Sequence, residues 1–167
     1  TSGDSWTYRL VAGADTAAAS LLETRESAVN GSITVATNKI VRTGTGDIDM
    51  AARRDIKLFD RAAVYTAGIA ASSHPDGFSP INGASSQNSI SSIFPDGGGD
   101  VTLTAGERIV MVSTGTTPAT EKDPVGRGIN QWLFRAGGDT VDLQWWPRIA
   151  SFQQGVAAFG GGNVALD

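Results

Sequence analysis

The sequence contains no cysteine and only one histidine, His74. Without cysteine, the chain forms no disulfide bond, no thiolate zinc site and no cysteine nucleophile. A single imidazole also leaves little for a Ser-His-Asp triad or a histidine-rich metal site, and no partner for His74 stands out in the sequence. We therefore predict a protein that is not an enzyme and that holds no cofactor and no metal.

Charge is sparse, and its balance is acidic. The chain carries 13 Lys and Arg against 17 Asp and Glu, and its only adjacent basic pair is Arg53-Arg54. A run of phosphates needs a stripe of basic residues to neutralise it, so nucleic-acid binding is disfavoured. No apolar run approaches the roughly 20 residues that cross a bilayer, and the first residues lack a signal-peptide pattern. We expect a soluble chain without membrane insertion.

Aromatic residues are few and concentrated in the last third of the chain, whereas glycine, serine, threonine and alanine are abundant. Small residues in long turns, together with short β-branched runs, are typical of antiparallel β proteins. At 167 residues the chain has the size of one domain. We predict an all-β fold, an antiparallel β-sandwich of the jelly-roll or immunoglobulin-like type with at most one or two short helices. The domain spans residues 1–152, and residues 153–167 form a glycine-rich tail.

The clearest β pattern runs from Val101 to Val112. Val101 and Leu103 alternate with threonines, as in a strand with one face in water, whereas residues 109–112 are an unbroken apolar run, as in a strand covered on both faces. Gly106, between them, supplies the residue that a tight turn needs. The pattern predicts a β-hairpin.

Two further hairpins are predicted. Asn30-Gly31 has the composition of a two-residue turn and is flanked by alternating apolar residues. Residues 130–135 and 140–145 also alternate, on the two sides of a Gly-Gly-Asp turn.

Helix is expected in at most two places. Residues 14–22 are either a short helix or a loop, and Asp47 or Asp49 is placed to cap a short helix over residues 50–54. No internal repeat is evident in the sequence.

Two regions supply the candidate binding residues. Residues 72–88 are dense in Ser, Pro, Gly and Asn, and so long a loop in a compact domain tends to be functional, so we interpret it as an interaction arm. Trp145 and Trp146 are adjacent in a predicted strand and should point to opposite faces, which leaves one of them to bind a sugar or a neighbouring subunit. The alternative is that a loop or the tail covers it. The candidates are His74, Phe78, Trp132, Trp145, Trp146 and Arg148.

Two aspartate pairs suggest calcium binding. Asp47 and Asp49 are separated by one residue, and Asp96 and Asp100 flank three glycines, as in the turns of calcium-binding β-rolls. Those sites are built from stacked repeats of the turn, and here the turn occurs once. We therefore favour aspartates that cap loops, with calcium binding as the alternative.

The strand pair from Asp100 to Gly115, with small-residue loops on both sides, resembles accessory β-sandwich proteins of tailed-bacteriophage virions, such as head decoration proteins and fibre or spike heads. The resemblance rests on residues 103–110, a strand, a glycine turn and a second strand. It implies a structural virion component, assembled in the host cytoplasm, that packs as a homo-oligomer against other copies or other virion proteins. The alternative function is a carbohydrate- or receptor-binding module that presents a tryptophan to a surface glycan.

Overall fold

The computed structural model describes residues 5–27, 29–72, 94–112, 132–138, 141–147, 149 and 152–167, and their regular structure is almost entirely β. The predicted all-β class is therefore confirmed. The strands are β1 (Tyr8–Ala12), β2 (Ile33–Val35), β3 (Ile40–Thr43), β4 (Ile48–Ala52), β5 (Asp55–Phe59), β6 (Ala63–Thr66), β7 (Ile69–Ser72), β8 (Phe94–Asp96), β9 (Val101–Ala105), β10 (Arg108–Val112), β11 (Leu133–Gly138), β12 (Val141–Pro147), β13 (Gly155–Ala158) and β14 (Val164–Leu166).

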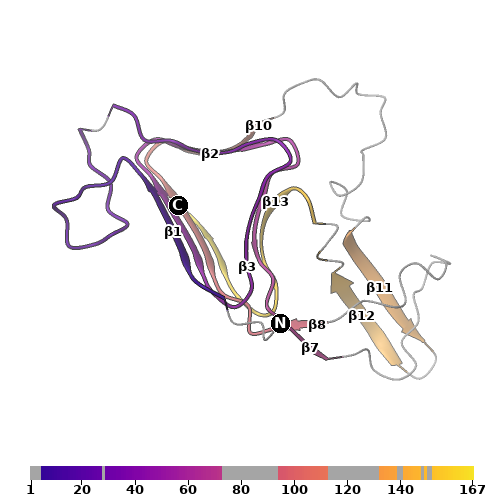
Figure 1. Ribbon diagram of the computed structural model, residues 1–167. Helices are drawn as coiled ribbons and strands as arrows, with labels where there is room; N and C mark the ends of the chain where they lie inside the picture. The colour runs from indigo at the N-terminus through magenta and orange to yellow at the C-terminus, as the bar shows by residue number, and fades with distance from the viewer. Residues whose placement is uncertain are drawn as a thin grey trace, which may run out of the picture.

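Ten of these strands stack in three parallel sheets that form the sides of a triangular β-solenoid (Figure 1). Sheet I has the order β1-β4-β9-β14, sheet II the order β2-β5-β10, and sheet III the order β3-β6-β13. Every neighbouring pair within these sheets is parallel. The predicted antiparallel sandwich is therefore wrong, and the antiparallel ladders among the described strands are the hairpins β7–β8 and β11–β12.

The chain passes through sheets I, II and III in turn and then returns to sheet I one level further along. Strands β1 to β3 form the first coil, β4 to β6 the second, and β9, β10 and β13 the third, and β14 begins a fourth. Ile56 follows its register partner Ile33 by 23 positions, which is the length of a coil without an insertion. Longer segments are inserted after β1, after β6 and after β10.

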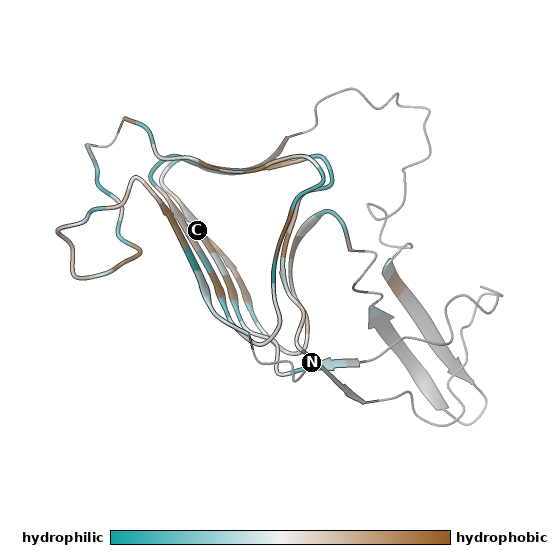
Figure 2. Ribbon diagram, viewed as in Figure 1, coloured by the Kyte–Doolittle hydropathy of each residue, from teal (hydrophilic) through white to brown (hydrophobic). Residues whose placement is uncertain are grey.

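Alternation along the strands decides which side chains enter the interior. Ile48 and Met50 of β4 are in register with Val101 and Leu103 of β9, and all four side chains fill the space between the sheets. Figure 2 shows polar residues at the corner between sheets II and III, and both apolar and polar residues along the strands of sheet I. The buried interior also contains Val35, Ala52, Ile56, Leu58, Ala62 and Val64.

Both strands of the predicted hairpin at residues 101–112 are present, but they do not pair with each other. β9 lies in sheet I and β10 in sheet II, so Gly106 occupies the corner between two sheets instead of a hairpin turn. A Cβ atom at Gly106 would lie 2.2 Å from the backbone oxygen of Arg53 in the coil before. Glycine is needed here because the corners of successive coils stack closely.

Of the other turns and helices predicted from local sequence, some are absent and one hairpin is present. No hairpin forms at Asn30-Gly31, because the strand that follows, β2, pairs in parallel with β5. Residues 50–52, expected to begin a helix, belong to β4, and residues 14–22 form turns and bends beside an isolated bridge from Ala14 to Thr24. The third predicted hairpin is confirmed as β11–β12, but its first strand begins three residues later than predicted and includes Gly137 and Gly138 of the predicted turn.

The glycine-rich segment 153–167 takes part in the solenoid. β13 pairs with β6 in sheet III, and β14 pairs with β9 in sheet I. Its weakly apolar sequence concealed two strands, because a parallel strand near the end of a stack needs only a few inward apolar residues.

Candidate functional sites at the corners, the lateral insertion and the ends

A glycine and an Asp or Asn recur at the corner between sheets III and I. The pairs are Gly46-Asp47, Gly99-Asp100 and Gly162-Asn163, each directly before a strand of sheet I. A Cβ atom at Gly99 would lie 2.6 Å from the backbone oxygen of Gly46, and one at Gly162 would lie 2.1 Å from that of Gly99. The backbones of successive corners therefore approach so closely that only glycine fits.

The residues after these glycines link the coils by hydrogen bonds. The Asp47 N–H donates to Thr7 Oγ1 at 3.2 Å, the Asp100 N–H to Asp47 Oδ1 at 2.9 Å, and the Asn163 N–H to Asp100 Oδ1 at 2.7 Å. Each side chain thus satisfies a backbone N–H of the next coil. We call the column Thr7, Asp47, Asp100 and Asn163 the corner ladder.

The corner ladder belongs to an internal repeat that the sequence interpretation missed. Glycine and Asp or Asn are followed by an apolar residue, any residue and a second apolar residue at 46–50, 99–103 and 162–166. The spacing between copies is unequal because the inserted segments differ in length, so no fixed period marks the repeat. The signal was the shared motif.

The aspartates considered for calcium make other contacts. Asp49 pairs with Arg9 at 3.4 Å, while Asp47 and Asp100 accept from backbone N–H groups of the corner ladder. Asp96 Oδ1 accepts from the N–H of Gly97 at 2.8 Å. Asp47, Asp96 and Asp100 therefore make the contacts of aspartates that cap loops, whereas Asp49 forms an ion pair. Within the described ranges, no group of three or more His, Cys, Asp or Glu is placed to hold a metal ion.

An ion-pair cluster lies at the corner between sheets I and II. The buried carboxylate of Asp55 accepts from Arg108 at 2.9 Å, its register partner in the next coil, and from Lys57 at 3.0 Å. These bonds, first that from Arg108, hold the pKa of Asp55 below its usual value. Beside them the exposed Arg54 pairs with Glu107 at 2.8 Å.

An aromatic cluster covers the outer face of sheet III. Tyr65 of β6 meets Phe152 edge to face with ring centroids 5.5 Å apart, and Phe152 also meets Trp132 at 5.0 Å and Phe159 at 5.3 Å. Burial in this cluster raises the pKa of Tyr65. The contacts attach residues next to the β11–β12 insertion to the wall of the solenoid.

The predicted binding residues have different outcomes. Trp132 is half-buried in the aromatic cluster on sheet III. Trp145 and Trp146 lie on β12, opposite Arg135 and Phe134 of β11, and their side chains are outside the described part. His74, Phe78 and Arg148 also lie outside the described residues. A binding role for these six residues stays a prediction.

Both ends of the solenoid leave inward-facing apolar side chains in solvent. Tyr8 and Leu10 are in register with the buried Ile48 and Met50, yet they are 45% and 38% exposed. At the other end Val164 and Leu166 follow the buried Val101 and Leu103, and they are 44% and 58% exposed. The positions that form the core in the middle coils are therefore uncovered at both ends.

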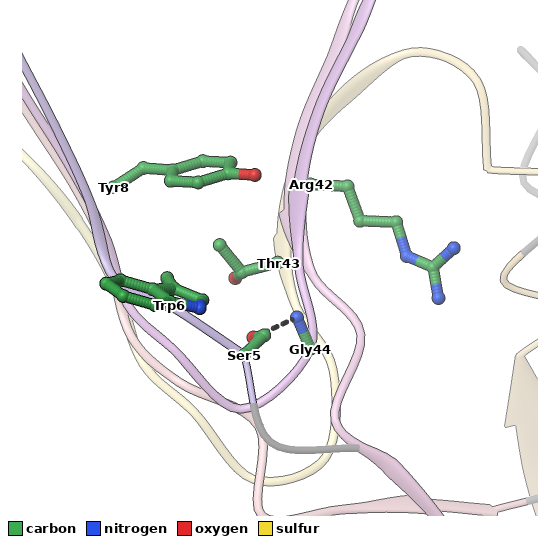
Figure 3. A pocket seen from close by; sticks show the side chains of 6 residues that line it. All are labelled: Ser5, Trp6, Tyr8, Arg42, Thr43 and Gly44. Carbon is green, nitrogen blue, oxygen red and sulfur yellow. Dashed lines mark hydrogen bonds between the residues drawn. The ribbon is translucent and has the colours of Figure 1, made fainter. Parts of the chain in front are cut away.

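The end formed by the first coil is also hollowed. The hollow has a volume of about 430 Å³ and is lined by Ser5, Trp6, Tyr8, Arg42, Thr43 and Gly44. Tyr8 extends across it from β1 toward β3, and Arg42 points away from it (Figure 3). Ser5 Oγ accepts from the N–H of Gly44 at 2.7 Å, which fixes the entry of the chain into β1.

Comparison of the chain with protein-family models, with curated proteins and with solved structures gives no match. In the described part of the chain, no helix has the length and apolar character needed to cross a membrane.

Proposed function

We propose that the chain is a structural segment of an extended fibre or spike stem, which acts mechanically by holding other parts at a distance. The single observation that carries this proposal is the stacking of coils along one axis, with the same Gly-Asx corner repeated from level to level. A solenoid of this kind lengthens by adding coils without changing its cross-section. A stem uses that property, whereas a globular decoration protein does not.

The lateral insertions fit the same role. The β11–β12 hairpin follows β10 and is anchored beside sheet III through the aromatic cluster, so it leaves the stacking of the coils uninterrupted. Insertions at the corners of a rigid solenoid are suited to contact neighbours from its side. In this proposal the partners are other copies of the chain and other virion proteins, and no catalysis is involved.

Immunogold electron microscopy tests the function and the location together. An antibody against the folded chain should label thin projections on virus particles, and pre-incubation with purified chain should remove the label. Label on projections of a cell surface would keep the stem function and move its location from the virion to a cell. Label confined to the shell of a capsid, or to soluble cytoplasmic protein, would contradict a stem.

The second candidate function is carbohydrate binding by the β11–β12 hairpin. It is favoured by the confirmed β12 strand, on which Trp145 and Trp146 are neighbours beside a partner strand that carries Arg135. A glycan array with the unchanged chain, Trp145→Ala and Trp146→Ala tests it. Loss of a glycan signal in one variant, with unchanged thermal unfolding, would support binding, and the absence of any signal from the unchanged chain would reject it.

A further inference from the structure

The first corner between sheets III and I, directly before β1, differs in one residue from the corners stacked on it. Counted back from the register of β1 with β4, Trp6 stands at the position of Gly46. The residue at this position in the later corners is always glycine: Gly46, Gly99 and Gly162. The first corner therefore carries the largest side chain at the position where the others carry none.

Lack of space, and not backbone conformation, requires glycine at the later corners. None of these three glycines has a positive φ, so other residues could adopt the same backbone conformation. A Cβ atom at Gly46 would lie 2.7 Å from the backbone oxygen of Ser5, and one at Gly99 would lie 2.6 Å from that of Gly46. Each Cβ points at the coil before its own, so a side chain at this position takes the space of the preceding corner.

Toward the second coil, the first corner keeps the contacts of the others. Thr7 Oγ1 accepts from the N–H of Asp47 at 3.2 Å, the role that Asp47 has toward the next level. Ser5 Oγ accepts from the N–H groups of Gly44 at 2.7 Å and of Gly46 at 3.0 Å. The residue that differs is therefore the one whose side chain is directed away from the second coil.

The side chain of Trp6 is not drawn back into the solenoid. Trp6 lies at the corner beside Ser5, and it is 87% exposed (Figure 3). The contacts that exclude a side chain at Gly46 and Gly99 begin at the Cβ atom, whose position does not depend on the rotamer. Rotation of the indole would therefore not make room for a stacked corner.

We propose that Trp6 blocks the face of the first coil that points away from β4 against a further coil of the same repeat. The block applies equally to a coil of the same chain and to one of a second copy. It follows from the side chain at position 6, whatever stands before that residue. As a result, coils stack on only one face of the first coil, and the stack has a fixed direction. The inference concerns stacking alone and does not depend on the proposed stem function.

The chain contains a segment that can test the block. Residues 46–67 carry β4, β5 and β6 without an insertion, and a coil of this kind spans 23 positions, as from Ile33 to Ile56. A copy of residues 46–67 in place of residues 1–4 puts the first glycine of the copy 23 positions before residue 6. Its three strands are then in register with β1, β2 and β3. This extension is made with Trp6, with Trp6→Ala and with Trp6→Gly, and each extended chain is compared with the unextended chain that has the same residue 6.

Hydrogen exchange of residues 33–35 and 40–43 is the readout, because a stacked coil would cover these strands. We expect the extension to slow exchange there by about tenfold or more with Trp6→Gly, and to leave it unchanged with Trp6. Trp6→Ala should behave like Trp6, because a methyl group already meets the stacked corner.

Three results would overturn the inference. Equal slowing with Trp6 and with Trp6→Gly would mean that the side chain does not block a coil. Slowing with Trp6→Ala as great as with Trp6→Gly would contradict a block that begins at the Cβ atom. Unchanged exchange in all three extended chains would mean that residue 6 does not decide whether a coil stacks.

Discussion

The middle coils and the end coils of the solenoid have the same construction but different environments. In sheet I, Leu10, Met50, Leu103 and Leu166 occupy one column, with Met50 and Leu103 buried between neighbours and the two outer leucines in solvent. Burial of a large apolar side chain stabilises a fold by about 1.5–3 kcal/mol relative to exposure. The difference teaches that stability in this molecule comes from being stacked on both sides, and that an inward-facing position is a core position only with coils above and below it.

The largest expected effect on stability comes from the column of Leu10, Met50, Leu103 and Leu166 in sheet I. Leu103→Ala should lower the free energy of unfolding by about 2–5 kcal/mol, because it leaves a cavity between two packed coils. Leu166→Ala, the matched control in the same column, removes a side chain that is already more than half exposed and should cost roughly 1 kcal/mol or less. Urea denaturation of both variants measures the pair. Equal losses would mean that the end coil is as well covered as the middle.

The corner glycines give the next effect. Gly99 lies between Gly46 and Gly162 in the stack of corners, and Gly99→Ala brings a methyl group within 2.6 Å of the backbone oxygen of Gly46. Overpacking of this kind costs about 1–3 kcal/mol. Gly162→Ala meets a backbone oxygen too, but its corner has a described neighbour on one side only and can move away. Thermal unfolding should show the greater loss for Gly99→Ala, and the reverse order would contradict the stacking of corners.

Much of this fold was accessible from the sequence only in outline. The strands at 101–105 and 108–112 followed from their alternation and apolar run, because those patterns are local. Their partners did not, because alternation is the same for a strand in an antiparallel sandwich and for one in a parallel solenoid with a corner at Gly106. Pairing depends on residues more than 50 positions away, as for Asp47 and Asp100.

The candidate sites were likewise predictable only where the signal is local in the sequence. The loop-capping role of Asp47 and Asp100 was inferred from residue type, whereas their alignment in one column required the three-dimensional stack. Exposure of Leu10 and Leu166 could not be inferred, since nothing local separates them from Leu103. Trp132 was expected to take part in binding, and its half-buried place against sheet III was hidden because the aromatic partners come from β6 and residues 152–159.

The corner ladder offers a smaller effect. Asp100→Ala removes the acceptor of two hydrogen bonds from Asn163, one from its backbone N–H and one from its Nδ2, and should cost about 1–2 kcal/mol. Asn163→Ala leaves the backbone bond to Asp100 in place and should cost a fraction of that. Differential scanning calorimetry of both variants compares an inner level of the ladder with its last level. A larger loss for Asn163→Ala would show that the ladder does not transmit stability between coils in this way.

The pH dependence of Asp55 is the smallest effect. Because the folded state lowers the pKa of this carboxyl below its usual value of 3.8, the ionised form stabilises the fold above about pH 4, and that contribution is lost as the pH falls through the folded-state pKa. Asp55→Asn should therefore be less stable than the unchanged chain at neutral pH, and the difference should shrink in acid. Glu107→Gln removes an exposed partner of Arg54 and should show a smaller change in both respects. Denaturation curves from pH 7 to about pH 2 measure this, and a difference that is constant with pH would contradict the ion pair.

The measurement that tests the account most directly is residue-resolved hydrogen exchange of the whole chain under native conditions. A solenoid with open ends predicts slowest exchange in β4, β5, β6 and β9, which have parallel neighbours on both sides. It predicts faster exchange in β1 and β14, which among the described strands have a neighbour on one side only. Protection should decrease from the middle coils toward both ends. If β1 and β14 exchange as slowly as β4 and β9, the ends are not open, and the account of stacked coils with two uncovered ends is wrong.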